Sequence, residues 1–138
     1  MPKYCRHAIA NLVIACLAAS FTAFSQVQAS DAVAKAFSGH QTELFLQDSG
    51  KVVRILADDN DGSRHQRFIV ETNSGITVLI VHNIDLAPRL DSLSLDEVVS
   101  FRGEYIWNAQ GGLVHWTHHD PDKKITGGWL LYRGKYYR

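Results

Sequence analysis

Three histidines fall within a span of five residues in the second half of the chain. His115, His118 and His119 belong to the run Leu-Val-His-Trp-Thr-His-His-Asp-Pro, and His65 and His82 lie earlier in the sequence. Imidazole titrates near neutral pH, binds transition metals and transfers protons. This density of histidines therefore marks a candidate site for metal binding, acid–base catalysis or ligand binding.

The spacing within the run decides which side chains can act together. On a strand, side chains alternate between two faces, so His115 and His119 share one face while Trp116 and His118 share the other. Zinc sites use neutral imidazoles with carboxylate support, and open catalytic sites use three protein ligands. The pattern predicts His115 and His119 as ligands of a divalent transition metal such as zinc, with His65 as the third.

Other interpretations of these residues stay open. His82 or Asp120 would also serve as the third ligand, and the sequence contains no His-Glu-x-x-His motif. The alternatives are metal-free acid–base chemistry, or histidines that make local hydrogen bonds at the end of a surface strand. His82 follows Val78 and Ile80 on one strand face, a placement more typical of a hydrogen-bonded core histidine than of a ligand.

Arginines accompany the histidines. His65 and Arg67 share a face of one predicted strand, where a guanidinium can bind a carboxylate or phosphate through two hydrogen bonds. An anion pocket would consist of Arg64, Arg67, Arg89 and Arg102. The alternative is that Arg67 and Arg102 pair across strands with Glu71 or Glu104.

The elements that would position these residues are mostly strands. We expect a short helix that Ser30 or Asp31 caps and Gly39 ends. Residues 87–95 are expected to hold a helical turn, and residues 58–63 and 108–112 are expected to be polar or glycine-rich turns. The predicted strands cover residues 50–57, 66–71, 76–84, 97–107, 113–117, 129–132 and 135–137.

Three strands, an irregular connection and a two-stranded hairpin follow the order of a small OB-like Greek-key β-barrel. The fold class is therefore all-β with a short N-terminal helix, and an SH3-like barrel or a small sandwich is the alternative. Aromatic residues are frequent in the C-terminal half. They would stack on bases or sugars if exposed, or fill the barrel if buried. They are Trp107, Trp116, Trp129, Tyr105, Tyr132, Tyr136 and Tyr137.

The first residues have the pattern of a signal peptide. Lys3 and Arg6 precede an apolar stretch, and small residues lead to a predicted cleavage near Ala29. Residues 1–29 would be the signal peptide and residues 30–138 a single periplasmic or secreted domain, without a membrane span after cleavage. A lipoprotein signal ending at Cys16 is the lesser alternative.

Cleavage changes the composition of the chain. Cys5 and Cys16 are the only cysteines, so the mature domain would have neither a disulfide nor a thiolate metal site. The full chain has 14 basic and 14 acidic residues, and the loss of Lys3 and Arg6 leaves 12 basic against 14 acidic. This balance gives no signature of non-specific nucleic-acid binding.

Four motifs are shared with a known family. They are His65-Gln66-Arg67-Phe68, His-Asn-Ile-Asp-Leu-Ala-Pro-Arg from His82, Gly103-Glu104-Tyr105 and His-Trp-Thr-His-His-Asp-Pro from His115. Over residues 50–137 the chain resembles a bacterial family of small exported proteins, the domain of unknown function 3465. The resemblance implies an exported OB-like barrel and no activity. Ile125 stands where the family pattern has a histidine before Gly128, which weakens any mechanism that needs that histidine.

Two functions follow from these observations. The first is a periplasmic binding module for a small anion, a glycan or a nucleic acid, which predicts exposed aromatic residues on the second and third strands. The second is a hydrolase that uses the histidines with or without a metal, which predicts that His65, His115 and His119 converge beside a carboxylate. A structural domain of the envelope would leave the histidines scattered.

Overall fold

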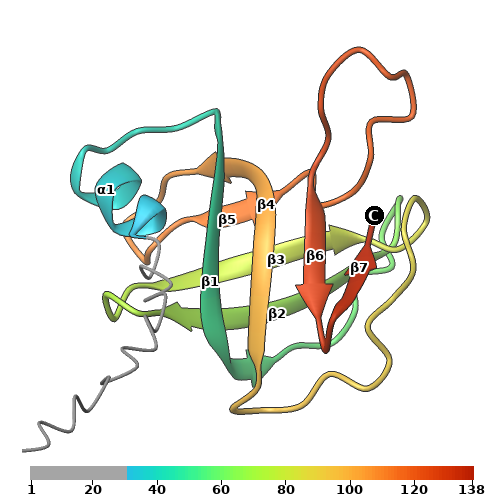
Figure 1. Ribbon diagram of the computed structural model, residues 1–138, viewed down its shortest axis with the longest axis horizontal. Helices are drawn as coiled ribbons and strands as arrows, with labels where there is room; N and C mark the ends of the chain where they lie inside the picture. The colour runs from blue at the N-terminus through green and yellow to red at the C-terminus, as the bar shows by residue number, and fades with distance from the viewer. Residues whose placement is uncertain (1–30) are drawn as a thin grey trace, which may run out of the picture.

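The computed structural model describes residues 31–138, so the predicted signal peptide lies outside the described residues. These residues form a short helix and seven strands (Figure 1). In chain order they are α1 (Ala32–Ser38), β1 (Leu44–Ile55), β2 (His65–Thr72), β3 (Thr77–Asn83), β4 (Val98–Ile106), β5 (Leu113–His115), β6 (Trp129–Tyr132) and β7 (Lys135–Tyr137). None of the helical structure within residues 31–138 is long and apolar enough to cross a bilayer.

Five of the strands close into a barrel. β1 pairs antiparallel with both β2 and β4, and β2 pairs antiparallel with β3. The short β5 completes the circle, because it runs parallel to β3 and antiparallel to β4. The resulting order, β1-β2-β3-β5-β4, is that of an OB-like Greek-key barrel. The predicted all-β fold class with a short N-terminal helix is confirmed.

β1 is longer than the sequence pattern indicated. It begins at Leu44, before the predicted start at residue 50, and it passes through the buried Asp48. The carboxylate of Asp48 accepts a hydrogen bond from the backbone N–H of Val33 at 2.9 Å, which ties α1 to the barrel. A buried carboxylate breaks the apolar alternation, so the pattern missed this half of the strand. A bulge between Val52 and Arg54 then bends β1 between its two partners.

α1 lies beside the barrel (Figure 1). It packs against the barrel through Val33 and Ala36, which are both buried. It ends before Gly39, as predicted. The expected capping hydrogen bond from Asp31 is not formed; its side chain instead pairs with Nζ of Lys35 at 2.9 Å. The helix therefore depends on its contacts with the barrel, as is usual for a helix of two turns.

The aromatic residues divide between core and surface. Phe68, Phe101, Tyr105 and Tyr132 are almost completely buried and fill the barrel. Phe68 is the only Phe, Tyr or Trp on β2 and β3. The exposed aromatic face that a binding module predicted for these two strands is therefore absent, because their outward positions carry aliphatic and polar residues.

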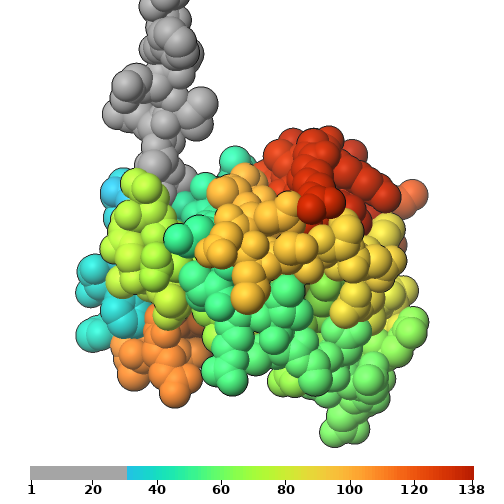
Figure 2. All heavy atoms as spheres, turned by 90° about the horizontal axis from the view of Figure 1, so that it is seen from below, coloured from blue at the N-terminus to red at the C-terminus, as the bar shows by residue number. Residues whose placement is uncertain are grey.

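The C-terminal strands form a hairpin outside the barrel circle. β6 pairs with β4, and β7 pairs only with β6. The predicted hairpin around Arg133 and Gly134 is confirmed. Figure 2 shows this hairpin (red) at one edge of the molecule and the segment that connects β1 to β2 (green) at the opposite edge.

Candidate functional site

The floor of the candidate site consists of outward-facing residues on adjacent strands. His65 opens β2 and pairs in register with Asn83, the last residue of β3. The neighbouring residues Gln66 and His82 are buried, so His65 and Asn83 face outward. β5 lies beside β3 and ends at His115, which therefore reaches the same end of the sheet.

The wall of the site is the segment that follows β5. Trp116 has φ +54°, a left-handed conformation that is uncommon for a bulky residue and that ends the strand. The rings of Trp116 and His118 then stack, with centroids 5.2 Å apart and planes inclined by 28°. Because the strand stops at His115, the alternation expected for this run does not apply beyond it. His115, Trp116 and His118 all line one pocket.

We call this cavity the Trp116 pocket. It has a volume of about 320 Å³ and lies at the end of the barrel where β2 begins and β3 and β5 end. Its lining residues are His65, Val81, Asn83, Leu86, His115, Trp116, His118, Asp120, Pro121 and Asp122. The lining contains histidines, carboxylates, an amide and an aromatic ring, but no lysine or arginine.

His118 is held in one tautomer. Its Nδ1 lies 2.7 Å from the carbonyl oxygen of His119, and since a carbonyl only accepts, Nδ1 carries the proton. Burial is the main cause that lowers the pKa of His118 below its ordinary value, so the neutral form is favoured. Nε2 then keeps its lone pair. Nε2 has no hydrogen-bond partner among the described residues, whereas every fully buried polar side-chain atom of these residues has one. Nε2 is therefore accessible to solvent, and His118 lines the pocket.

His115 pairs with a carboxylate that the sequence analysis did not assign to the site. Its Nε2 lies 2.9 Å from Oε2 of Glu104, its partner in register on β4. Donation from Nε2 to the carboxylate leaves Nδ1 of the neutral ring as an acceptor. Glu104 and His115 thus form a carboxylate–imidazole dyad at the pocket. Both residues belong to the motifs singled out in the sequence, but their pairing depends on the strand register.

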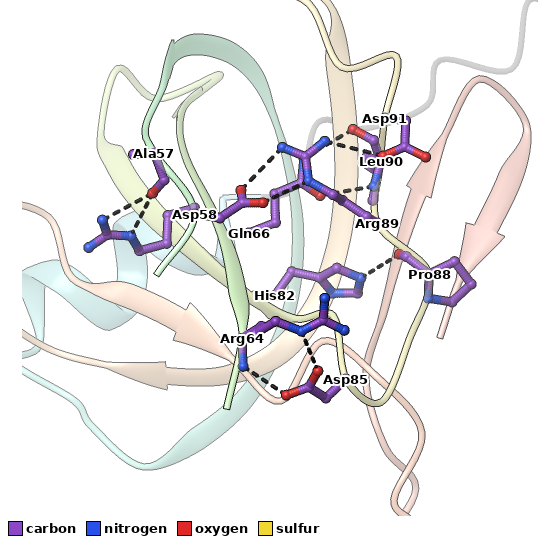
Figure 3. Close-up of polar contacts among 11 residues, drawn as sticks. Ala57, Asp58, Arg64, Gln66, His82, Asp85, Pro88, Arg89, Leu90 and Asp91 are labelled. Carbon is purple, nitrogen blue, oxygen red and sulfur yellow. Dashed lines mark hydrogen bonds and ion pairs between the residues drawn. The ribbon is translucent and has the colours of Figure 1, made fainter. Parts of the chain in front are cut away.

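His82 is a core residue, as its strand position indicated. It is fully buried, and its Nε2 donates to the carbonyl oxygen of Pro88 at 3.0 Å (Figure 3). Its Nδ1 lies 2.8 Å from Oγ1 of Thr117, the residue between Trp116 and His118. Burial lowers the pKa of His82 to about 4. His82 therefore does not enter the pocket. It joins the loop after β3 to the segment after β5, and both segments contribute to the wall of the pocket.

The loop after β3 is held to the barrel without the helical turn expected in residues 87–95. The side-chain amide of Gln66 makes two hydrogen bonds with the backbone of Leu90, at 2.9 and 3.0 Å (Figure 3). Arg64 binds Asp85 through its backbone N–H and its Nε. These contacts fix the loop that contributes Leu86 to the pocket.

Asp120 organises the loop between β5 and β6. Its carboxylate accepts hydrogen bonds from the backbone N–H groups of Asp122, Lys124 and Ile125, at 3.0, 2.7 and 3.0 Å. The hydrogen bond from Ile125 is the main cause that lowers the pKa of Asp120. Asp120 lines the pocket, and its carboxylate fixes the conformation of the loop through these hydrogen bonds.

The arginines do not gather into the expected anion pocket. Arg67 donates from Nε and Nη2 to the carbonyl oxygen of Ala57, and neither Glu71 nor Glu104 is its partner. Arg89 binds both oxygens of Asp58 (Figure 3), and this hydrogen bond lowers the pKa of that carboxyl. Arg102 donates to the Gly127 carbonyl oxygen and lies over the Phe45 ring. These three guanidinium groups therefore bind structural partners, and none of the four predicted arginines lines the Trp116 pocket.

The predicted metal ligands are not gathered as a set. His65 and His115 line the pocket, whereas His119 is exposed and stands outside its lining. His118 takes the place that His119 was expected to fill. Among residues 31–138, no group of three or more His, Cys, Asp or Glu side chains is arranged to hold a metal ion. The expected position of His119 differs because the chain turns at Trp116, and metal binding itself stays a prediction.

Comparison with known proteins places these residues in a family. A family model described as Protein of unknown function (DUF3465) matches residues 14–138. The chain belongs to this family. No curated protein matches the DUF3465 chain. Segments from all four motifs that suggested the family meet at or beside the pocket: His65 and Asn83 line it, Glu104 binds His115, and His82 supports Thr117.

Proposed function

We propose that this DUF3465 protein is an exported binding domain whose Trp116 pocket holds a small, uncharged, polyhydroxylated ligand of the glycan type. The observation that carries the proposal is the half-buried Trp116 ring, set among hydrogen-bonding side chains of His65, Asn83 and His118. An aromatic ring covers the apolar face of a sugar, while amides and imidazoles bind its hydroxyl groups. OB-like barrels bind oligosaccharides on the face of their second and third strands, on which His65 and Asn83 lie.

The charges around the pocket favour a neutral ligand over an anion or a nucleic acid. Neither lysine nor arginine lines the cavity, and the carboxylates of Asp120 and Asp122 do. A phosphate or sulfate would meet these carboxylates without a fixed cation to offset them. Neutral hydroxyl groups, in contrast, can donate to the carboxylates and to Nε2 of His118.

Titration with neutral oligosaccharides of glucose and of N-acetylglucosamine tests this proposal, with tryptophan fluorescence and calorimetry as readouts. Trp116→Ala should abolish binding, whereas Trp129→Phe, which changes a tryptophan of β6 outside the pocket, should leave it intact. Inorganic phosphate and single-stranded DNA serve as competing probes. Failure of every neutral sugar to bind, or binding that survives Trp116→Ala, would refute the assignment.

A second function, hydrolysis, is favoured by the dyad of Glu104 and His115. A carboxylate that orients an imidazole raises the ability of that ring to act as a general base. The unprotonated Nε2 of His118 and the ring of His65 line the same cavity and would bind a metal ion or polarise a substrate. In this case the protein would cleave a small ester or glycoside bound against Trp116.

Chromogenic esters and glycosides test the second function, beside the metal content of the purified protein. Hydrolysis that Glu104→Gln and His115→Gln both reduce by at least a hundredfold would support general-base catalysis, because such groups contribute about 10²–10⁴-fold. Zinc bound in near-stoichiometric amount and lost on His115→Gln would identify a metal-dependent site. Turnover that persists in both variants would argue against the dyad.

Export is the third part of the proposal. The sequence pattern of residues 1–29 supports it. Expression of the full chain in a bacterial host should give a protein in the periplasmic or secreted fraction. Its mass should correspond to cleavage after Ala29. Retention of the uncleaved mass in the cytoplasm would contradict this localisation.

A further inference from the structure

The charges of the chain are separated along its sequence. Residues 123–138 contain five lysines and arginines and no acidic residue, whereas residues 31–122 contain seven basic and 14 acidic residues. The basic residues belong to the loop before β6 and to the β6–β7 hairpin. In the folded domain Glu97 pairs with Arg133 and Asp122 with Lys124, so the positive charge of this edge comes from Lys123, Lys135 and Arg138. A cluster of basic residues of this kind attracts an anionic partner.

The basic residues of the hairpin are accessible. Lys135 and Arg138 are exposed, and within the described part of the chain neither forms a salt bridge. The Lys135 Nζ lies 4.9 Å from the Tyr137 ring centroid, and the Arg138 guanidinium lies 5.7 Å from that of Tyr136. Lys135 and Arg138 thus flank two aromatic residues at the end of the chain.

Exposed apolar groups accompany these charges. The Tyr136 side chain is 51% exposed and packs edge-to-face on Trp129. Ile125, in the loop that leads into β6, is 49% exposed and follows the exposed Lys123 and Lys124. Amphipathic rings, an exposed aliphatic side chain and lysines are the combination that suits the interface of a bilayer, where apolar groups enter the headgroup region and cations remain among the phosphates.

We propose that the β6–β7 hairpin and the loop before it form a docking surface for an anionic phospholipid bilayer. At the opposite edge of the molecule, the segment that connects β1 to β2 carries Asp59 and Asp61 beside Asp58, which Arg89 binds, so a planar anionic surface on the hairpin avoids these carboxylates (Figure 2). A flexible polyanion such as single-stranded nucleic acid would use the basic residues but not the exposed aliphatic side chain of Ile125. The bilayer is therefore the partner that the basic residues and the exposed apolar groups together favour.

Sedimentation with lipid vesicles tests the docking surface on protein expressed from the full-length sequence. Binding is compared between vesicles of phosphatidylcholine alone and vesicles that also contain phosphatidylglycerol. We expect binding only to the anionic vesicles, and weaker binding at high salt. The double variant Lys135→Gln/Arg138→Gln should weaken binding about 25-fold, since each basic residue near an anionic surface contributes about fivefold.

The control is Lys35→Gln/Lys51→Gln, which removes the same charge from exposed residues outside the hairpin and should bind as the wild type does. Thermal unfolding shows that each variant is folded. Equal binding to both kinds of vesicle, or equal weakening by the two double variants, would overturn the proposal. Binding to a single-stranded oligonucleotide without binding to anionic vesicles would overturn it as well.

Discussion

His82 and Thr117 are joined inside the barrel, with Nδ1 of the imidazole 2.8 Å from Oγ1 of the threonine. Nε2 of His82 donates to the Pro88 carbonyl oxygen, so Nδ1 of the neutral ring accepts the Thr117 hydroxyl proton. Thr117 lies between Trp116 and His118, which line the pocket. A histidine that never touches the pocket thereby holds both the wall after β5 and the loop after β3.

This buried histidine makes the stability of the domain depend on pH. The pKa of His82 is about 4 in the folded chain against an ordinary value of 6.5, because burial disfavours the charged ring. The unfolded chain therefore takes up a proton first as the pH falls. Stability is fully present above pH 6.5 and declines by roughly 3 kcal/mol toward pH 4. Urea unfolding across this range measures the decline.

The variant His82→Gln separates this histidine from other titrating groups. It should be less stable than wild type at pH 7, since a buried hydrogen-bonded ring is lost, and should lose much less stability between pH 6.5 and pH 4. His119→Gln, which removes an exposed imidazole, is the matched control and should keep the wild-type pH dependence. An unchanged pH dependence in His82→Gln would contradict the expected role.

The loop between β5 and β6 should depend on Asp120. Asp120→Asn replaces a carboxylate that accepts three backbone hydrogen bonds, so the amide protons of Lys124 and Ile125 should exchange faster with solvent. Because the pKa of Asp120 is lowered, the wild-type protection should persist at mildly acidic pH and be lost only once the carboxylate is protonated. Hydrogen exchange followed by NMR measures both effects.

Asp122→Asn is the control for this loop, because the side chain of Asp122 is largely exposed and pairs with Lys124. It should leave the exchange of the two amides nearly unchanged. Equal acceleration in both variants would mean that general loop charge, rather than the hydrogen bonds of Asp120, holds the segment.

Much of the fold was predictable because the barrel has one buried face. Alternate residues of β2 and β4 point into a single core, so their period of two was visible in the sequence. The first half of β1 was missed because Asp48 occupies an inward position. No local pattern signals that a carboxylate will be buried beside a helix N–H fifteen residues earlier in the chain.

The site was predictable in its residues more than in its geometry. The density of histidines identified His65, His115 and His118, which line one pocket. The expectation that His119 would join them assumed that the strand continues, whereas Trp116 adopts a positive φ and turns the chain. Glu104 was missed as a partner of His115 because register between β4 and β5 is a long-range property.

Gly127 and Gly128 allow the segment between β5 and β6 to pack tightly, and Gly128 offers a test of this packing. A Cβ atom at residue 128 would lie 2.0 Å from the Trp116 carbonyl oxygen and 2.2 Å from that of Arg102. Gly128→Ala should therefore destabilise the domain by about 2 kcal/mol or more, because backbone has to move. In Gly39→Ala, the added Cβ atom would lie 3.3 Å from its nearest neighbours, so the loss of stability should be clearly smaller. Thermal and urea unfolding compare the two, and equal losses would contradict this packing argument.

The two histidines nearest Trp116 should be opposite tautomers. His118 donates from Nδ1 to the carbonyl oxygen of His119, and His115 donates from Nε2 to Glu104. Long-range ¹H–¹⁵N spectra of the rings distinguish the two forms directly. Above neutral pH we expect the Nδ1–H form at His118 and the Nε2–H form at His115.

Glu104→Gln provides the decisive comparison for this prediction. The glutamine side chain keeps an oxygen that accepts from His115 but removes the negative charge, so the Nε2–H tautomer of His115 should persist in this variant. His118 depends on a backbone carbonyl and on burial, so its tautomer and its lowered pKa should not change. A change of tautomer at either ring in this variant would contradict these assignments. The observation of Nε2–H at His118 would remove the lone pair that both proposed functions place in the pocket.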